Sequence, residues 1–267
     1  MAEKKREKLD TILKELNSFV VAFSGGVDSS FLLHRAHSLK KLNIIGVTIR
    51  TPYIPGIEIK EASDFAKKFG INHRILDLTF PESIRYNPSD RCYLCKKILF
   101  SELLTFARNN GYRYVIDGTN ADDTGDFRPG LKALLELEIK SPLLEAGLTK
   151  NDIRGLLRQE GISIWDKPAM ACLLTRIPHE TEVTEGMLRM VEQAENFLLN
   201  QGYPGVRVRI HGDLARIECL PGYFEKMIQK SDKEQIISNL KKIGFRYVSL
   251  DLEGYRSGSS NPEIDHL

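Results

Sequence analysis

The chain has 267 residues, and its 38 lysines and arginines against 36 aspartates and glutamates give a formal net charge of +2. A charge this close to zero provides no strong attraction to a polyanion, which argues against a dedicated nucleic-acid binder. Hydrophobic residues make up 42% and charged residues 28%, a globular composition. No apolar run approaches the roughly 20 residues of a membrane helix. We therefore expect a cytoplasmic protein that binds neither a membrane nor a nucleic acid.

The first half of the chain alternates amphipathic runs, typical of helices, with short continuous apolar runs, typical of buried strands. In chain order, the predicted elements are a helix over 9–16, a strand over 19–23, a helix over 28–39, a strand over 44–49, a helix over 58–70, a strand over 73–78, a helix over 95–111 and a strand over 113–118. This alternation predicts a doubly wound α/β fold, with a parallel sheet between two layers of helices.

The pattern changes after about residue 175. A helix over 184–202 precedes two strands around a His-Gly-Asp turn, then a helical stretch to Gly244 and a last strand over 245–254. The order αββαβ predicts a smaller α+β domain. We expect a nucleotide-binding domain over 1–175 and a domain for substrate binding and oligomerisation over 176–267, with a loose tail over 257–267.

The loop between the first strand and the next helix reads SGGVDSS, residues 24–30. Its glycines allow a tight turn, and the helix N-terminus offers N–H donors and a partial positive charge to a phosphate. Three serine hydroxyls add donors. The loop has no lysine and so is not a Walker A motif. Asp28 would repel a phosphate unless a cation such as Mg²⁺ stood between them. A glycine turn with a capping aspartate is the alternative.

Further polar residues follow the other predicted strands. In a parallel sheet these positions share one edge, where ligands bind. Arg50 follows the second strand, and the sequence GTNADD, residues 118–123, follows the fourth. Adjacent carboxylates at a strand end hold a hard cation or form a turn. Lys96 and Arg128 are candidate cations for a nucleotide or substrate, although each alone is more often a solvated charge.

Three of the four cysteines form a second candidate site: Cys92 and Cys95 in a CxxC pair, and the distant Cys172. In a reducing compartment, clustered thiols indicate metal or redox chemistry more than disulfides. Four thiolates would indicate structural zinc, whereas three can hold a [4Fe–4S] cluster with one iron open. Zinc, iron–sulfur and unrelated thiols all stay open on spacing alone. Cys219 follows a strand and is expected in the core.

The loop SGGVDSS resembles the PP-loop of the N-type ATP pyrophosphatases, and GTNADD resembles a partner motif of the same proteins. SGGVDSS, RCYLCK, GTNADD, SPLLEAGLTK, WDKPAMACLLTRIP and VRVRIHGDLARIE occur in the order and spacing of the LarE family. The resemblance covers about residues 20–256. It implies an ATP-dependent sulfurtransferase that adenylylates a carboxylate of pyridinium-3,5-biscarboxylic acid mononucleotide, releases pyrophosphate and makes a thiocarboxylate for the nickel-pincer nucleotide cofactor.

The resemblance also implies roles for individual residues. Nucleotide-binding roles fall on Ser24, Gly25, Gly26, Asp28, Ser29, Ser30, Arg50, Lys96, Thr119 and Asp123. Mg²⁺ would be bound by Asp28 and Asp123, and catalysis assigned to Cys92, Cys95, Cys172, Asp28 and Arg176. Substrate binding would fall on Arg176, Glu195, Arg207 and Arg209. The two strand arginines lie two positions apart and so share a face. Guanidinium groups suit phosphates and carboxylates.

The family is known in two versions that differ in their source of sulfur. One sacrifices a cysteine that sits one position before Cys172, where this chain has Ala171. The other carries three cysteines like those found here and resembles enzymes with a [4Fe–4S] cluster that carries an extra sulfide. The departure at Ala171 favours the second version. The sulfide donor is unknown, and a homo-oligomer is expected because related proteins assemble symmetrically.

Two other functions remain open from the sequence. PP-loop enzymes that thiolate tRNA also combine this loop with cysteines, but they should show a basic face or an RNA-binding appendage. A nucleotide-binding zinc module without catalysis is the second. Metal analysis and a pyrophosphate-release assay would distinguish these functions.

Overall fold

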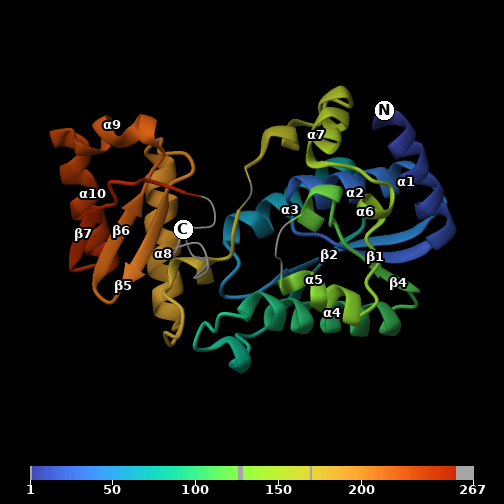
Figure 1. The fold of residues 1–267 in the computed structure, drawn as a ribbon, viewed down its shortest axis with the longest axis horizontal. Helices are drawn as coiled ribbons and strands as arrows, with labels where there is room; N and C mark the ends of the chain where they lie inside the picture. Colours follow the sequence, from blue (N-terminus) through green and yellow to red (C-terminus); the bar gives the residue numbers. More distant parts are fainter. Residues whose placement is uncertain (1, 126–128, 169, 257–267) are drawn as a thin grey trace. The chain divides into compact units, whose positions relative to one another are not determined.

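The structure, a computed structural model, describes residues 2–125, 129–168 and 170–256 (Figure 1). Arg128 and the tail over 257–267, both named above, lie outside the described residues. The chain divides into two compact units. The first comprises residues 1–79 and 90–170, and the second comprises 80–89 and 171–267. The sequence prediction placed the division at 175/176 and did not anticipate that residues 80–89 join the second unit.

The first unit is built on a sheet of four strands in the order β3-β2-β1-β4, and every neighbouring pair is parallel. The strands are β1 (Ser18–Ala22), β2 (Asn43–Arg50), β3 (His73–Asp77) and β4 (Tyr114–Ile116). The helices are α1 (Ala2–Leu16), α2 (Val27–Ser38), α3 (Gly56–Phe69), α4 (Arg91–Asn109), α5 (Pro129–Glu136), α6 (Pro142–Glu145) and α7 (Lys150–Gln159). Short 3₁₀ helices cover Ala121–Gly125 and Ser163–Asp166.

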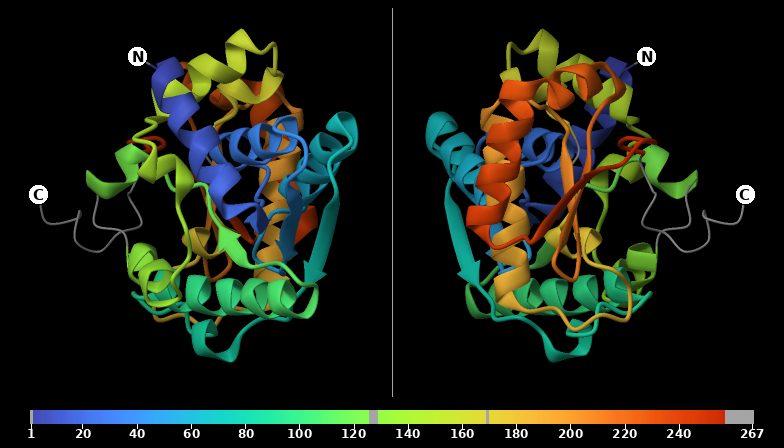
Figure 2. Two further views of the ribbon diagram at one scale, coloured as in Figure 1. Left: turned by 90° about the vertical axis from the view of Figure 1, so that its right-hand side faces the viewer. Right: turned by 90° about the vertical axis from the view of Figure 1, so that its left-hand side faces the viewer.

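Helices cover both faces of this sheet (Figures 1 and 2). Phe19 and Val21 of β1 join one core with α1, α2, α3 and α7, while Val20 between them joins a second core with α4 and α5. Alternate side chains of a strand point to opposite faces, so a strand buried on both faces is apolar throughout. This confirms the doubly wound α/β fold.

Local sequence signals determine several helix ends. Gly70 ends α3 in the left-handed conformation with φ 64°, as a C-cap glycine does. Thr149 caps α7: its hydroxyl accepts from the Asp152 N–H at 3.1 Å while the Asp152 carboxylate accepts from the Thr149 N–H at 3.1 Å. Among the helices of the described residues, none is both long and apolar enough to cross a bilayer.

The second unit is an α+β fold, as predicted, but the helical stretch expected before Gly244 consists of two helices, so the order is αββααβ. Its elements are α8 (Glu185–Asn200), β5 (Arg207–His211), β6 (Leu214–Glu218), α9 (Phe224–Ile228), α10 (Lys230–Ile243) and β7 (Tyr247–Leu250). Short 3₁₀ helices cover Glu82–Ile84, Leu173–Arg176 and Pro221–Tyr223. β5 and β6 are antiparallel around the turn at Gly212, and β7 adds parallel to β6. α8 and α10 pack against each other and against the sheet.

Residues 80–89 belong to the second unit through both side-chain and backbone contacts. Ile84 and Asn87 are fully buried. The Val183 N–H donates to the Arg85 carbonyl at 2.7 Å, and the Glu180 N–H donates to the Asn87 carbonyl at 3.3 Å. This segment is followed directly by α4, so the chain returns from the second unit to the first just before the CxxC pair.

Candidate functional site

The PP-loop connects the end of β1 to the start of α2 and leaves that helix end open. Gly25 has φ 73°, and a Cβ there would lie 3.0 Å from the Ala62 Cβ, so both conformation and space require glycine. Gly26 is the N-cap of α2 and provides no side-chain cap. The first backbone bond of the helix is from the Ser30 N–H to the Gly26 carbonyl at 2.9 Å. An uncapped helix N-terminus is a site for a phosphate.

The hydroxyls of the loop lie beside this helix end. The Ser24 and Ser29 oxygens are 3.1 Å apart, and the Ser29 hydroxyl donates to the Gly26 carbonyl at 3.2 Å. The Ser30 side chain is fully buried, and its hydroxyl has no hydrogen-bond partner among the described residues. Buried polar groups are normally paired, so an orphan hydroxyl at the start of α2 fits a site built to receive a ligand.

Asp28 is the acidic group of the loop, and it is held by a residue distant in sequence. Its carboxylate forms an ion pair with Lys150 at the start of α7. Burial raises the pKa of Asp28, with Lys150 opposing that shift and the nearby Asp123 carboxylate adding to it. One Asp28 oxygen, Oδ1, is buried without a partner among the residues that the structure describes. Two carboxylates close together with an unsatisfied oxygen fit a divalent cation.

The GTNADD segment packs directly against this helix start. A Cβ on Gly118 would lie 2.9 Å from the Ser29 nitrogen, so only glycine allows the approach. The Thr119 hydroxyl donates to the Asp117 carboxylate, which also accepts from the Ser141 hydroxyl at 2.7 Å. The Asp123 carboxylate accepts from the Asn120 N–H at 2.9 Å. The fold therefore brings Asp28 and Asp123 together, while Thr119 makes an internal bond.

Two lysines that the sequence prediction did not single out complete this end of the sheet. Lys150 pairs with Asp28, and its N–H donates to the Asp122 carboxylate at 2.8 Å. Lys167 donates to the Gly25 carbonyl at 2.8 Å and pairs with Glu61 at 2.6 Å. Both lysines lie in sequence segments that carry the family resemblance, which was the available signal.

Arg50 and Lys96 occupy different surroundings in the first unit. Arg50 ends β2 as predicted, but its exposed guanidinium pairs with Asp77 at the end of β3. The Lys96 side chain lies along Gly130 of α5, where a Cβ would meet the Lys96 Cδ at 2.7 Å. Their nucleotide-binding roles stay predictions.

Of the predicted thiol set, the first unit supplies Cys92 and Cys95, which lie one helical turn apart in the first turn of α4. Cys92 is exposed and Cys95 half-buried, with its sulfur 3.3 Å from the hydroxyl of the buried Tyr53. Cys172 belongs to the second unit and is also half-buried. Across the described ranges, no group of three His, Cys, Asp or Glu side chains lies close enough to hold a metal ion.

Cys219 differs from the other three thiols. It is 1% exposed in the core of the second unit, and burial raises the pKa of its thiol. The expectation that Cys219 is a core residue is confirmed. The accessible thiols are therefore the three that the sequence grouped together, a donor set that fits an iron–sulfur cluster with one open iron as well as zinc.

The second unit contains an unusual group of buried charges. Arg176 is 2% exposed and forms a two-bond ion pair with Glu195, at 2.8 and 3.0 Å. Glu195 also accepts from the Val208 N–H at 3.0 Å. Arg209 pairs with Glu218, which is 2% exposed. The structure thus brings together in one unit all four residues predicted to bind substrate.

Arg207 is the buried cation of this group without a carboxylate partner among the described residues. It is 7% exposed, donates to the Val206 carbonyl at 2.9 Å and stacks on Tyr255. Burial lowers the pKa of Arg207 and the nearby Arg176 lowers it further, while the Glu195 carboxylate, which is already paired with Arg176, partly opposes the shift. A buried guanidinium next to other guanidinium groups is unfavourable unless an anion compensates it. The cluster is therefore suited to a phosphate or carboxylate.

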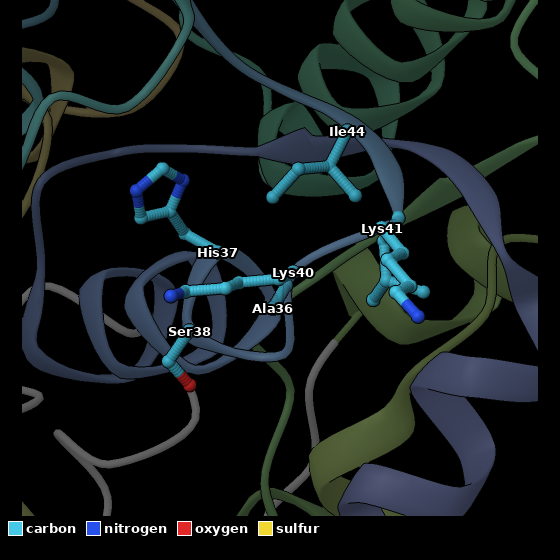
Figure 3. Close-up of a pocket in the computed structure, with 7 residues that line it drawn as sticks. Ala36, His37, Ser38, Lys40, Lys41 and Ile44 are labelled. Carbon is cyan, nitrogen blue, oxygen red and sulfur yellow. The ribbon is translucent and has the colours of Figure 1, made fainter.

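A cavity of about 390 Å³ lies at another place in the first unit (Figure 3). It is formed where α2 ends and β2 begins, so it lies at the sheet edge opposite to the PP-loop. The Lys40 side chain extends between His37 and Ser38, whereas Lys41 turns away (Figure 3). None of the residues predicted from the sequence lines this cavity, and it is separate from the nucleotide site.

Comparison with known proteins agrees with this geometry. The asparagine synthase family matches residues 12–101, which include the PP-loop. A pyridinium-3,5-bisthiocarboxylic acid mononucleotide synthase of Lactiplantibacillus plantarum is 37% identical, with 97% of this chain and 95% of that protein covered. Uncharacterized proteins of Synechocystis sp. and Methanocaldococcus jannaschii are 38% and 36% identical, over 98% and 95% of this chain.

A more distant match covers only part of the chain. The tRNA-specific 2-thiouridylase MnmA of Rickettsia felis is 30% identical, but the match covers only 57% of this chain and 52% of that protein. Identity along nearly the whole of both chains is found with the mononucleotide synthase instead. The chain therefore belongs to the LarE family, within the PP-loop ATP pyrophosphatases.

Proposed function

We propose that the chain is an ATP-dependent sulfurtransferase that converts a carboxylate of pyridinium-3,5-biscarboxylic acid mononucleotide into a thiocarboxylate. The observation that carries this proposal is the 37% identity to the synthase over 97% of the chain, which spans both the PP-loop and the arginine cluster. The thiocarboxylate would then serve the nickel-pincer nucleotide cofactor.

ATP phosphates would bind at the N-terminus of α2. Ser24, Gly25, Gly26, Ser29 and Ser30 would provide N–H and hydroxyl donors to the β- and γ-phosphates. Mg²⁺ would be bound by Asp28 and Asp123 and would neutralise charge on the departing pyrophosphate. Mg²⁺ at Oδ1 of Asp28, which is unpaired within the described part of the chain, would weaken the ion pair between the other Asp28 oxygen and Lys150, because two cations would then share one carboxylate charge. Lys150 would then be free to contact a phosphate.

The reaction needs ATP because a carboxylate is a poor acyl donor: direct attack on it would have to expel oxide, a very poor leaving group. A substrate carboxylate oxygen attacks the α-phosphorus, the bond to the β-phosphate oxygen breaks, and pyrophosphate leaves. The acyl adenylate carries AMP as leaving group. Sulfide then attacks the acyl carbon, and the carbon–oxygen bond to AMP breaks to give the thiocarboxylate. Donors at the PP-loop stabilise the charge that develops on pyrophosphate.

The anionic substrate would bind at the arginine cluster. Arg207 is the strongest candidate for its phosphate, since this buried guanidinium has no carboxylate partner among the described residues. Arg209 lies two positions along the same strand, although Glu218 already pairs with it. The substrate-binding roles of Arg176 and Glu195 stay predictions, because these two side chains pair with each other.

We propose that Cys92, Cys95 and Cys172 act together as the ligands of a [4Fe–4S] cluster. When bound, the cluster would supply the sulfide for the second step. Ala171 stands where the sacrificial cysteine of other family members is expected, which supports an external source of sulfur. The exposure of Cys92 fits ligand exchange from solvent. A homo-oligomer is part of the same proposal.

The deciding experiment is an anaerobic assay of the full-length protein with ATP, Mg²⁺, sulfide and the biscarboxylic acid mononucleotide. We expect pyrophosphate release that depends on the mononucleotide, and more than one thiocarboxylate per chain. Iron and acid-labile sulfide are quantified on the same sample. One zinc per chain without iron would refute the cluster and leave the adenylylation intact. Pyrophosphate release dependent on tRNA would replace this function by tRNA thiolation, which the MnmA match makes the second candidate.

A further inference from the structure

Cys172 lies in the segment 171–178 of the second unit. Most backbone carbonyls of this segment accept a hydrogen bond from a side chain. Cys172 is the N-cap of the short 3₁₀ helix Leu173–Arg176. One turn of such a helix has little stability of its own. Arg176 binds the segment from within and is itself held by Glu195 of α8. Asn87 of the segment 80–89 and Arg209 of β5 bind it from outside.

Arg176 holds the start of the segment. Its Nη1 donates to the carbonyls of Ala171 at 3.2 Å and Cys172 at 3.3 Å, and to the Thr175 hydroxyl at 2.6 Å. Its Nε and Nη2 donate to Glu195 at 2.8 and 3.0 Å. Glu195 in turn accepts from the Val208 N–H, so these hydrogen bonds connect the segment to β5. The guanidinium is directed at the backbone of Cys172.

Asn87 holds the end of the segment. Its Nδ2 donates to the carbonyls of Leu174 at 3.2 Å, Ile177 at 2.8 Å and Pro178 at 3.1 Å. The side chain is fully buried, and the backbone is left-handed with φ 50°. Asparagine is one of the few residues other than glycine that adopts this conformation readily. Asn87 comes from the segment 80–89, which runs on into α4 and the CxxC pair.

We propose that Arg176 and Asn87 are positioning residues that fix the backbone around Cys172, and that Arg176 acts on the reaction through this segment and not by contact with substrate. The proposal rests on the proposed function, in which Cys172 is one of three cluster ligands. A thiol on a free one-turn segment would sample many orientations, and ordering it at the moment of reaction would raise the barrier. Five hydrogen bonds from two side chains to backbone carbonyls provide that order in advance.

The test uses full-length protein, with two readouts that do not depend on activity and one kinetic readout. The variants are Arg176→Lys, the neutral double variant R176Q/E195Q and Asn87→Ala, with Arg189→Gln as a control. Arg189 is an exposed arginine of α8 paired with Glu185, so the control removes a similar group from the same unit. The double variant leaves neither member of the Arg176–Glu195 pair as an unpaired buried charge, and it keeps the test usable if Arg176→Lys does not fold.

We measure hydrogen exchange of the segment and the rate at which iodoacetamide alkylates each thiol at one pH. The Thr175 and Ile177 amides, which bond to the carbonyls of Cys172 and Leu174, should exchange at least about tenfold faster in the three variants. Alkylation of Cys172 should rise by a similar factor, while Cys219 and the control do not change. In the sulfur-transfer assay, kcat should fall about tenfold or more with KM nearly unchanged.

Unchanged exchange together with a raised KM for the mononucleotide in Arg176→Lys would overturn the proposal and make Arg176 a substrate ligand. If the Thr175 and Ile177 amides exchanged in Asn87→Ala at the wild-type rate, the positioning role of Asn87 would be overturned. Failure of the proposed function looks different: the wild-type protein would make no thiocarboxylate, while faster exchange in the variants would still support the positioning role.

Discussion

The two candidate binding regions differ in what they are made of. The PP-loop site of the first unit consists mainly of backbone, with glycines, a helix N-terminus and small hydroxyls, and its charged groups lie at its margin. The arginine cluster of the second unit consists of buried charged side chains, and carboxylates from other elements hold two of its arginines, Arg176 and Arg209. A backbone site depends on local conformation, whereas a side-chain site depends on tertiary contacts. The predictions below test this difference.

The largest effect is expected from Asp28→Asn. The carboxylate is replaced by a neutral amide, so a Mg²⁺ ligand is lost and pyrophosphate release should fall at least about 100-fold. The variant should keep the wild-type Tm within a few degrees, because burial already disfavours the charged form of Asp28. The control is Asp64→Asn, which removes an exposed carboxylate paired with Lys60 on α3. Full activity in Asp28→Asn would remove this carboxylate from the mechanism.

The second prediction contrasts two buried arginines of the second unit. Arg176→Met leaves Glu195 buried and unpaired, so the free energy of unfolding should fall by about 3–5 kcal/mol. Arg207→Met removes a cation without a carboxylate partner among the described residues, so stability should stay the same or rise. Denaturant titration measures both.

The same Arg207→Met variant should raise KM for the mononucleotide at least about tenfold. A stable protein with weakened substrate binding is the signature of a residue kept for function at the expense of stability. A large loss of stability in Arg207→Met, with KM unchanged, would contradict the assignment of Arg207 to the substrate phosphate.

A smaller effect is expected where backbone segments meet in the first unit. Gly118→Ala would place a Cβ 2.9 Å from the Ser29 nitrogen, which should cost about 1–3 kcal/mol and weaken ATP binding. The matched control is Gly155→Ala inside α7, where nothing lies within 4 Å of the new Cβ. That variant should be more stable than the wild type by up to about 1 kcal/mol. Equal effects of the two substitutions would show that the close approach at Gly118 is not restrictive.

The smallest effect concerns pH. Burial lowers the pKa of His73, so the folded chain takes up this proton less readily than the unfolded chain. Stability should therefore fall as the pH drops through the ordinary histidine pKa of about 6.5. Tm measured between pH 7.5 and 5.5 should decrease, and His73→Gln should show a smaller decrease. The His73 Nε2 lies 2.8 Å from the Thr48 hydroxyl, which glutamine can also bond. An identical pH dependence in the variant would contradict this origin.

The difference between a backbone site and a side-chain site also explains how much of each region could be predicted from the sequence. The fold class, the alternating helices and strands of residues 9–118 and the open loop at α2 were predicted, because apolar period and glycine position act over a few residues. The helices α5, α6 and α7 and the division between α9 and α10 were not predicted. The sequence did not predict that residues 80–89 belong to the second unit. The Asn87 side chain donates to a carbonyl 90 positions away, and no local pattern reveals such a contact. Lys150 and Lys167 were missed for the same reason: a lysine next to a turn gives no local sign of its partner.

The sequence by itself determined that a phosphate-type loop follows β1 and that a CxxC pair and one distant cysteine accompany it. Local backbone preferences and the chemistry of each residue type are sufficient for that. Only the tertiary structure decided that Lys150 neutralises Asp28, that Arg176 is directed at the backbone of Cys172, and that Arg207 is buried without a carboxylate partner among the described residues. The partner of a charged side chain depends on which distant elements the fold brings beside it.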